Sequence, residues 1–428
     1  LGADTTLTTT DNNVTFSSTV DSDSAGTKRN LTLTLGSGSA TFSGIVGTTS
    51  LADITLNSSA TFNAAVTATN LTIAASKTAT VKDDVTIASN ITLNNNSTLA
   101  VVNTAAITIA GTIIENADGS TNTSITVKFN TASTAPEKVT FSGTVTADAI
   151  YVGDTAAATY AGYAHFTGSG GVTVADATVT SGDHVNEYSI MKFDYAVTAS
   201  NEITINDKNG TLYQAYLIFS GDNTATITGN IVTADDEGTL QITGSGKTFT
   251  GSIGSSTYQL ELINIDVATT FNGAVYTTDI EVDGAITSTS SLSVSEISTI
   301  NADITTTGTQ TYTGAATLNA DVILTTTNNN ISFGSTINSL NTTYRDLSLV
   351  TGSGNVSVTG IIGASNKLDV LTVNNTGTLT LSAATTVNTL TLTHTGGTTV
   401  GGTLTATTIN LTDTTDAANI TFNGNVSA

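Results

Sequence analysis

Several residue types that common folds and sites depend on are missing or rare in this sequence. The 428 residues include no cysteine, no tryptophan and a single proline, Pro136, and only 11% of them are charged. Glu, Lys, Gln and Arg, which long helices use heavily, are scarce, so the composition argues against helical domains. The lack of cysteine does not exclude export, because a secreted chain of this size needs no disulfides.

Positive charge is also rare. Lys and Arg total 11 against 34 Asp and Glu, giving a formal net charge of −23, and Lys28-Arg29 is the only adjacent basic pair. Binding to phosphates requires clustered basic residues, so we exclude nucleic acid and anionic lipid as partners. No apolar run approaches the ~20 residues of a membrane-spanning helix, and we expect no membrane span. Because the first residue is Leu1, we expect that a signal segment was removed or that the chain is a fragment.

What the chain does contain indicates β-strands. Thr, Ala, Ser, Asn and Gly dominate, and 38% of the residues are apolar, which is too many for a disordered chain. Apolar residues alternate with Thr, Ser or other residues over short runs, for example in 31–35, 125–129 and 390–392. Such alternation sends apolar side chains to one face of a strand, and the Gly, Asn, Asp and Ser between the runs suit turns. We therefore predict an all-β fold of short strands and frequent turns.

A local motif recurs along the chain: Thr, an aromatic residue, a small polar residue, usually Gly, and then an aliphatic residue. Phe42 and Phe62 lie 20 residues apart in two copies, and Phe249 and Phe271 lie 22 residues apart in two others. This spacing matches one coil of a β-solenoid, meaning one complete circuit of two or three short strands. The remaining copies are centred on Phe141, Tyr312 and Phe422.

A longer repeat supports the same architecture. The stretches that begin at Leu31, Leu240 and Leu347 share a G-S-G turn, a Gly two positions before an aliphatic residue, and the strand that follows. Self-similarity of this kind indicates stacked units, each too small to bury its own apolar face. We predict an elongated parallel β-solenoid (β-helix) with coils of roughly 20 residues. An array of β-sandwiches, which have longer strands, is the alternative.

Residue usage changes in the middle of the chain. We predict solenoid repeats over 1–150, an irregular, aromatic-richer solenoid segment or insertion over 151–238, and solenoid repeats over 239–428. Aromatic side chains supply contact area at modest entropic cost, so the tyrosines of the middle segment are a candidate interaction face, and a wider core that needs larger residues is the alternative. These tyrosines are Tyr151, Tyr160, Tyr163, Tyr188, Tyr195, Tyr213 and Tyr216.

One motif looks like a nucleotide site. The sequence TGSGKT, from Thr243 to Thr248, is similar to a phosphate-binding loop, but Gln241 stands where that loop has its first glycine. The two aligned repeats carry the same G-S-G turn without Lys-Thr. We therefore interpret TGSGKT as a structural turn.

Histidines are few and scattered. His184 and Glu187 would lie on opposite faces of a strand, and His165 and His394 stand alone, so nothing predicts a zinc site. A Ser-His-Asp arrangement stays open, because its members are distant in sequence. No G-x-S-x-G motif supports one.

Acidic residues cluster in three turns: Asp21 with Asp23, Asp83 with Asp84, and Asp235 with Asp236 and Glu237. Calcium takes six to eight oxygen ligands, which paired carboxylates and backbone carbonyls supply. We predict no required cofactor. The best candidate metal site is calcium at Asp235, Asp236 and Glu237, and solvated turn carboxylates are the alternative.

Three features of the sequence are similar to those of a known class of surface protein. They are the recurrent TFNG and TFSG units, the G-S-G turns, and a cysteine-free composition rich in Thr, Ala and Asn. The sequence resembles the repetitive passenger regions of bacterial autotransporter surface proteins of the rickettsial outer-membrane-protein-B type, and its composition is similar to that of bacterial S-layer proteins. The resemblance implies a β-solenoid on the bacterial cell surface or outside the cell, with an adhesive or layer-forming role.

Three functions therefore compete. We predict an extracellular structural protein, not an enzyme, that assembles with copies of itself into an S-layer, a sheath or a filament. The first alternative is an adhesin that binds a cell-surface glycan or a host receptor, which the tyrosine-rich segment favours. The second is a polysaccharide-acting β-helix enzyme, which needs Asp, Glu, Arg or Lys clustered in one groove.

Overall fold

The computed structural model describes residues 1–116, 122–129, 136–153, 161–181, 188–207, 215–234, 236–394, 396–413 and 419–427. Within these residues every regular element is a β-strand, and strands pair in parallel with their equivalents in the next coil. The predicted all-β, parallel β-solenoid is thereby confirmed, and antiparallel sandwiches are excluded. The chain divides into two units, Leu1–Gly229 and Asn230–Ala428, and the division falls inside the segment predicted at 151–238.

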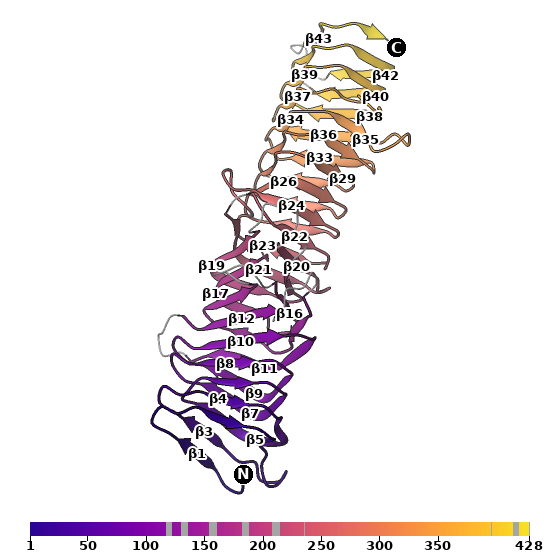
Figure 1. Ribbon diagram of the computed structural model, residues 1–428. Helices are drawn as coiled ribbons and strands as arrows, with labels where there is room; N and C mark the ends of the chain where they lie inside the picture. The colour runs from indigo at the N-terminus through magenta and orange to yellow at the C-terminus, as the bar shows by residue number, and fades with distance from the viewer. Residues whose placement is uncertain are drawn as a thin grey trace. The chain divides into compact units, whose positions relative to one another are not determined.

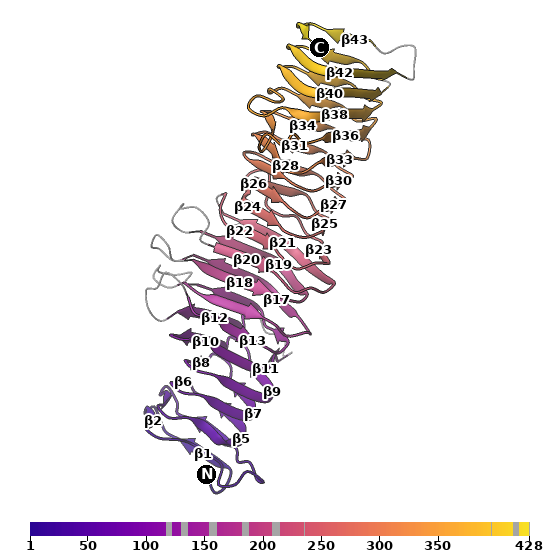
Figure 2. The same cartoon turned by 90° about the vertical axis from the view of Figure 1, so that its right-hand side faces the viewer.

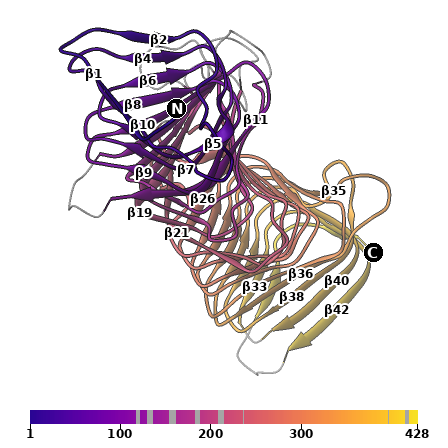
Figure 3. The same ribbon diagram turned by 90° about the horizontal axis from the view of Figure 1, so that it is seen from below.

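Strands of the first unit form three stacks, and Figure 3 shows part of one of them, with β2, β4, β6 and β8 side by side. The first stack contains β1 (Thr5–Thr8), β3 (Leu31–Thr34), β5 (Val46–Leu56), β7 (Val66–Ile73), β9 (Val85–Leu93) and β11 (Ile107–Glu115). The second contains β2 (Val14–Phe16), β4 (Ala40–Phe42), β6 (Ala60–Phe62), β8 (Thr78–Val81), β10 (Thr98–Asn103), β12 (Ser124–Phe129) and β15 (Ala149–Val152). The third continues from β11 of the first stack, with which β13 pairs, and contains β13 (Val139–Phe141), β16 (Tyr163–Phe166), β18 (Ser189–Phe193) and β20 (Ala215–Phe219). The remaining strands are β14 (Val145–Thr146), β17 (Val172–Thr180), β19 (Val197–Asn206) and β21 (Ala225–Thr233), the last of which reaches into the second unit.

The second unit is built in the same way, and Figure 2 shows β28, β31 and β34 one above another. One stack contains β23 (Lys247–Phe249), β25 (Thr269–Phe271), β27 (Ile286–Ser288), β30 (Ile304–Thr306), β33 (Val322–Thr326), β36 (Leu347–Gly352), β38 (Leu368–Asn375), β40 (Thr385–His394), β42 (Leu404–Asp413) and β44 (Val426–Ser427). Another contains β28 (Leu292–Val294), β31 (Gln310–Tyr312), β34 (Ile331–Phe333), β37 (Val356–Val358), β39 (Leu379–Leu381), β41 (Thr398–Val400) and β43 (Ile420–Phe422). The third contains β22 (Thr239–Ile242), β24 (Leu260–Ile265), β26 (Val275–Val282), β29 (Ser298–Ile300), β32 (Ala316–Leu318) and β35 (Ile337–Ser339).

Coil length varies around the predicted value. Hydrogen-bonded residues in adjacent coils are 17 positions apart at Leu260 and Thr277, 20 apart at Asn70 and Asn90, and 26 apart at Asp4 and Asn30. Parallel pairing continues through these differences. The extra residues of a long coil lie in its turns or at register shifts within long strands, as between Val46 and Leu51 of β5.

Alternation along each strand builds the core. In β3, for example, Leu31 and Leu33 are buried, and Thr32 and Thr34 are partly exposed. Because equivalent strands lie in register about one strand spacing apart, ~4.8 Å, identical inward residues stack along the axis. Phe16, Phe42 and Phe62 form such a stack, with ring centroids 4.6 and 4.7 Å apart.

The glycine of the local motif has a steric cause. In the first unit, a Cβ on Gly143 would clash with the backbone of Gly111 in the preceding coil, and in the second unit Gly273 and Gly251 show the same relationship. The chain turns shortly after the aromatic residue, and at these two glycines adjacent coils approach too closely for a side chain.

The three copies of the longer repeat share a left-handed glycine. Gly47, Gly254 and Gly363 have φ angles of 83°, 61° and 73°, a region that favours glycine. A Cβ at each would clash with a carbonyl oxygen of the next coil. The structure therefore places the aligned positions of the longer repeat in the same local geometry.

Outward positions of the stacks carry columns of short polar side chains. In the first unit a column of five threonines runs over consecutive coils: Thr6, Thr32, Thr55, Thr72 and Thr92. Figure 1 shows β1, β3, β5, β7 and β9, the strands that carry them. In the second unit a column of seven hydroxyl side chains runs over seven consecutive coils: Ser293, Thr311, Ser332, Ser357, Thr380, Thr399 and Thr421.

Candidate functional site

Strands β16, β18 and β20 of the first unit carry the densest outward group of aromatic side chains among the predicted positions. Tyr163, Ile190 and Tyr216 occupy equivalent outward positions on these strands, and all three are partly exposed. Tyr188 lies just before β18, and its ring meets that of Tyr216 edge-on, with centroids 6.2 Å apart. Burial, aided by the charge of Asp194 and by Tyr188, raises the pKa of Tyr163.

The other predicted tyrosines do not join this group. Tyr151 lies on β15, which belongs to a different stack, where its partners are Thr126 and Thr178. Tyr195 follows β18 in a turn. Tyr160 and Tyr213 lie outside the described residues. We refer to Tyr163, Tyr188, Ile190 and Tyr216 together as the aromatic face.

A hydrogen-bonded network adjoins the aromatic face. Nε2 of His165 lies 3.0 Å from Oδ1 of Asp194, and Oγ of Ser220 donates a hydrogen bond of 2.6 Å to the same oxygen. His165 and Asp194 have 13% and 24% of their side-chain surface exposed. On the neighbouring strand, Lys192 is the register partner of His165.

The environment keeps Asp194 ionised. Burial raises its pKa, but hydrogen bonds from His165 and Ser220, together with the charges of His165 and Lys192, outweigh burial, and the net pKa is lowered. An ionised carboxylate only accepts hydrogen bonds, so His165 donates through Nε2. Nδ1 of His165 is buried and has no partner in the part of the chain that the structure describes.

This network does not form a nucleophilic triad. In such a triad the imidazole stands between the hydroxyl and the carboxylate, so that it takes the hydroxyl proton. Here Asp194 stands between Ser220 and His165, and the serine donates to the carboxylate. These two hydrogen bonds connect three consecutive coils, through β16, β18 and β20. Asp194 and Ser220 were not predicted from sequence, although each follows a core Phe in the place of the motif's small polar residue.

The side chains at the remaining predicted histidine positions fall where the structure is not described. His184 and Glu187 lie outside the described residues, as does the side chain of His394. The predicted absence of a zinc site in their neighbourhood stays a prediction.

The acidic turns have a structural use. Asp236 accepts a hydrogen bond of 2.5 Å from the backbone N–H of Gln259 in the next coil, and Asp21 and Asp84 accept N–H groups of the next coil at 3.0 and 2.7 Å. A carboxylate of this kind satisfies a backbone donor that the strand ladders leave unpaired.

Other turn carboxylates pair locally. Both oxygens of Asp23 accept hydrogen bonds from Arg29, at 2.8 and 3.0 Å, and this lowers the pKa of Asp23. Asp83 accepts the N–H of its neighbour Asp84. Asp235 lies outside the described residues. Among the described residues, no group of three or more His, Asp or Glu side chains is arranged to bind a metal. Calcium at Asp235, Asp236 and Glu237 stays a prediction.

TGSGKT has the geometry of a structural turn. The segment connects β22 to β23, and a strand follows it, whereas a phosphate-binding loop leads into a helix. Lys247 begins β23 in an inward position with 1% of its surface exposed, and its register partner is Thr269. The lysine therefore belongs to the core.

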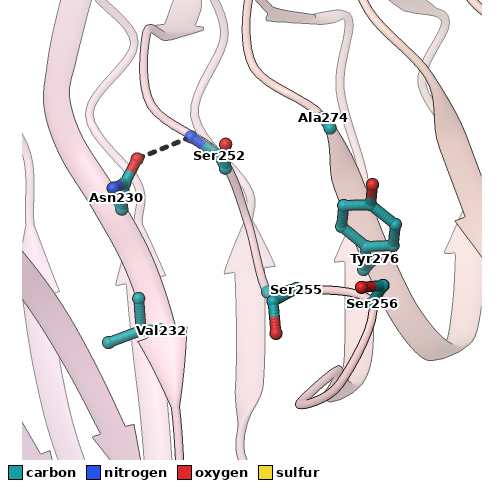
Figure 4. A pocket seen from close by; sticks show the side chains of 8 residues that line it. Asn230, Val232, Ser252, Ser255, Ser256, Ala274 and Tyr276 are labelled. Carbon is teal, nitrogen blue, oxygen red and sulfur yellow. Dashed lines mark hydrogen bonds between the residues drawn. The ribbon is translucent and has the colours of Figure 1, made fainter.

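The second unit has a pocket of about 410 Å³ on its outer surface, next to Gly254 (Figure 4). At Gly254 the chain turns into a short loop, in which Oγ of Ser255 accepts the N–H groups of Thr257 and Tyr258. Across the pocket, Oδ1 of Asn230 accepts the N–H of Ser252 at 2.9 Å. The lining consists of Asn230, Val232, Ser252, Gly254, Ser255, Ser256, Ala274 and Tyr276. We call it the Tyr276 pocket; sequence analysis did not predict it.

Comparisons of the chain with protein-family models, with curated proteins and with solved structures gave no match. Over the described residues, no helix is long and apolar enough to span a membrane.

Proposed function

We propose that this protein is an extracellular structural element that associates with copies of itself. The column of seven hydroxyl side chains from Ser293 to Thr421 carries the proposal. It presents nearly the same chemistry at every ~4.8 Å step. Such a surface fits a second regular surface in several registers, which suits growth into a sheet or filament. A receptor or substrate site needs side chains that differ from coil to coil.

Charge favours the seven-residue column as the place of contact. The chain carries a net charge of −23, so copies repel each other through their acidic surfaces. The seven-residue column is uncharged, and contact there avoids the desolvation of carboxylates. Because salt screens the repulsion, association should strengthen as ionic strength rises.

The proposal includes a position on or outside a bacterial cell and no catalytic role. It rests on the acidic, cysteine-free composition and on the resemblance to autotransporter passengers and S-layer proteins. The side chains of His165, Asp194 and Ser220 hydrogen-bond to one another across coils, and we assign them a structural role.

Sedimentation velocity over a range of protein concentrations tests the proposal. The wild type should form larger species as concentration and salt rise. Ser357→Lys combined with Thr380→Lys puts two like charges on adjacent coils in the middle of the column and should abolish association. The matched control is Thr287→Lys with Thr305→Lys, on adjacent coils of another outward column, and should associate normally. A wild type that remains monomeric at every concentration overturns the proposal.

The aromatic face favours a second candidate function, an adhesin. Its outward side chains differ from coil to coil, as a specific receptor site requires, and Tyr163 and Tyr216 offer partly exposed rings. Attachment of labelled protein to cells should then fall in Tyr163→Ala and Tyr216→Ala. Unchanged attachment in both variants would remove this candidate.

A further inference from the structure

The Tyr276 pocket contains several polar groups that the protein leaves available. Oδ1 of Asn230 accepts a hydrogen bond from the N–H of Ser252, but Nδ2 of Asn230 has no hydrogen-bond partner in the described residues. The same is true of the side-chain hydroxyls of Ser252, Ser256 and Tyr276. Figure 4 shows these side chains around the hollow, with the ring of Tyr276 beside Ser256.

Tyr276 distinguishes this pocket from the corresponding surface of the other two repeats. Gly47, Gly254 and Gly363 are equivalent, and a Cβ on them would meet the carbonyl oxygens of Thr67, Tyr276 and Thr386. Two copies therefore carry Thr where this one carries Tyr. Since Thr satisfies the fold at this position twice, the local structure does not require the aromatic ring.

We propose that the Tyr276 pocket binds one neutral pyranose unit of a glycan. A volume of about 410 Å³ falls within the range of small-molecule sites, ~300–1,000 Å³. A pyranose has an apolar C–H face, which packs on an aromatic ring, and hydroxyls that both donate and accept. Tyr276 supplies the ring, and Asn230, Ser252 and Ser256 supply an amide and two hydroxyls.

Charge specifies the class of sugar. The lining residues include no Lys, Arg, Asp or Glu, so nothing in the pocket compensates an ionised ligand. The net charge of −23 repels anionic sugars further. A neutral hexose or N-acetylhexosamine fits, and a uronic or sialic acid does not. This proposal is independent of self-association.

Saturation-transfer NMR and calorimetry on the whole chain, with the methyl glycosides of glucose, galactose, mannose and N-acetylglucosamine as probes, test the proposal. We expect at least one to bind with a Kd on the order of 1 mM, as a site with few contacts gives. Methyl glucuronide, an anionic probe of similar size, should bind at least tenfold more weakly.

Tyr276→Thr, which copies the other two repeats, should weaken binding at least tenfold without changing sedimentation or thermal unfolding. The matched control is Tyr258→Thr, because Tyr258 is 47% exposed nearby but does not line the pocket. It should bind as the wild type does. Absence of binding by all four neutral probes, equal binding of the glucuronide, or full binding by Tyr276→Thr would each overturn the proposal.

Discussion

The hydroxyl of Tyr312 donates a hydrogen bond of 3.0 Å to Oε1 of Gln310, two residues earlier in β31, and both side chains are fully buried. Nε2 of Gln310 donates to the carbonyl oxygen of Thr325 at 2.9 Å. The Tyr312 ring stacks on Phe333, with centroids 4.8 Å apart, and burial raises the pKa of its hydroxyl. Tyr312 and Gln310 therefore place polar groups in the core, and these groups form hydrogen bonds with each other and with the backbone.

Tyr312→Phe should lower the free energy of unfolding by about 1–2 kcal/mol, because it leaves Oε1 of Gln310 buried without a donor. Urea unfolding followed by circular dichroism measures the change. Thr311→Ala, at the outward position between the two residues, is the control and should change stability by less than about 0.5 kcal/mol. An equal effect of both substitutions would contradict the assignment.

Gly143→Ala should destabilise the first unit strongly, by about 3 kcal/mol or more, because the new Cβ clashes with the backbone of Gly111. Gly26→Ala is the matched control, since the nearest heavy atom to its Cβ would be Oγ of Ser24 at 3.8 Å. Hydrogen exchange near β13 and β11 locates the loss. Similar stability of the two variants would argue against close packing of the coils.

Asp194 should stabilise the protein at neutral pH and lose this effect in acid. Its folded pKa lies below the ordinary value of 3.8, so its contribution is present above pH ~4 and disappears as the pH falls through the folded pKa. Asp194→Asn should therefore cost about 1 kcal/mol at pH 7 and much less at pH 3. Unfolding curves of both proteins at several pH values provide the test, and a cost that does not change with pH would contradict it.

Asp346 should behave in the opposite way. Burial and the like charges of Asp321 and Asp369 raise its pKa, although a hydrogen bond from the N–H of Val370 opposes this. A raised pKa means that ionisation of Asp346 costs stability. The cost begins as the pH rises through the ordinary value of 3.8 and is complete above the raised pKa. Asp346→Asn keeps an acceptor for Val370 and should stabilise the second unit at pH 7 by about 0.2–1 kcal/mol. The gain should vanish near pH 3; a loss at pH 7 would refute this account.

The fold could be predicted from sequence because its causes are local. Alternation in runs such as Leu31–Leu35 and the spacing from Phe42 to Phe62 follow directly from parallel coils in register. The stacking partners could not be predicted. Phe62 lies in the second stack, whereas Phe141, in another copy of the local motif, lies in the third and stacks on Phe166. The difference depends on the lengths of the intervening turns.

The candidate sites were predictable only in part, for the same reason. The tyrosine-rich segment pointed to β16, β18 and β20, but Tyr151, only 12 positions before Tyr163, belongs to another stack. His165 meets Asp194 across 29 residues, which requires knowledge of the register. The Tyr276 pocket depends on a left-handed glycine and on backbone packing that composition does not reveal.

Negative-stain electron microscopy of the purified chain, at rising protein concentration and ionic strength, tests the central claim most directly. Self-association through the column of seven hydroxyl side chains from Ser293 to Thr421 predicts ordered sheets, tubes or fibres that disappear in the Ser357→Lys, Thr380→Lys variant. Single particles that never associate under any of these conditions would contradict it.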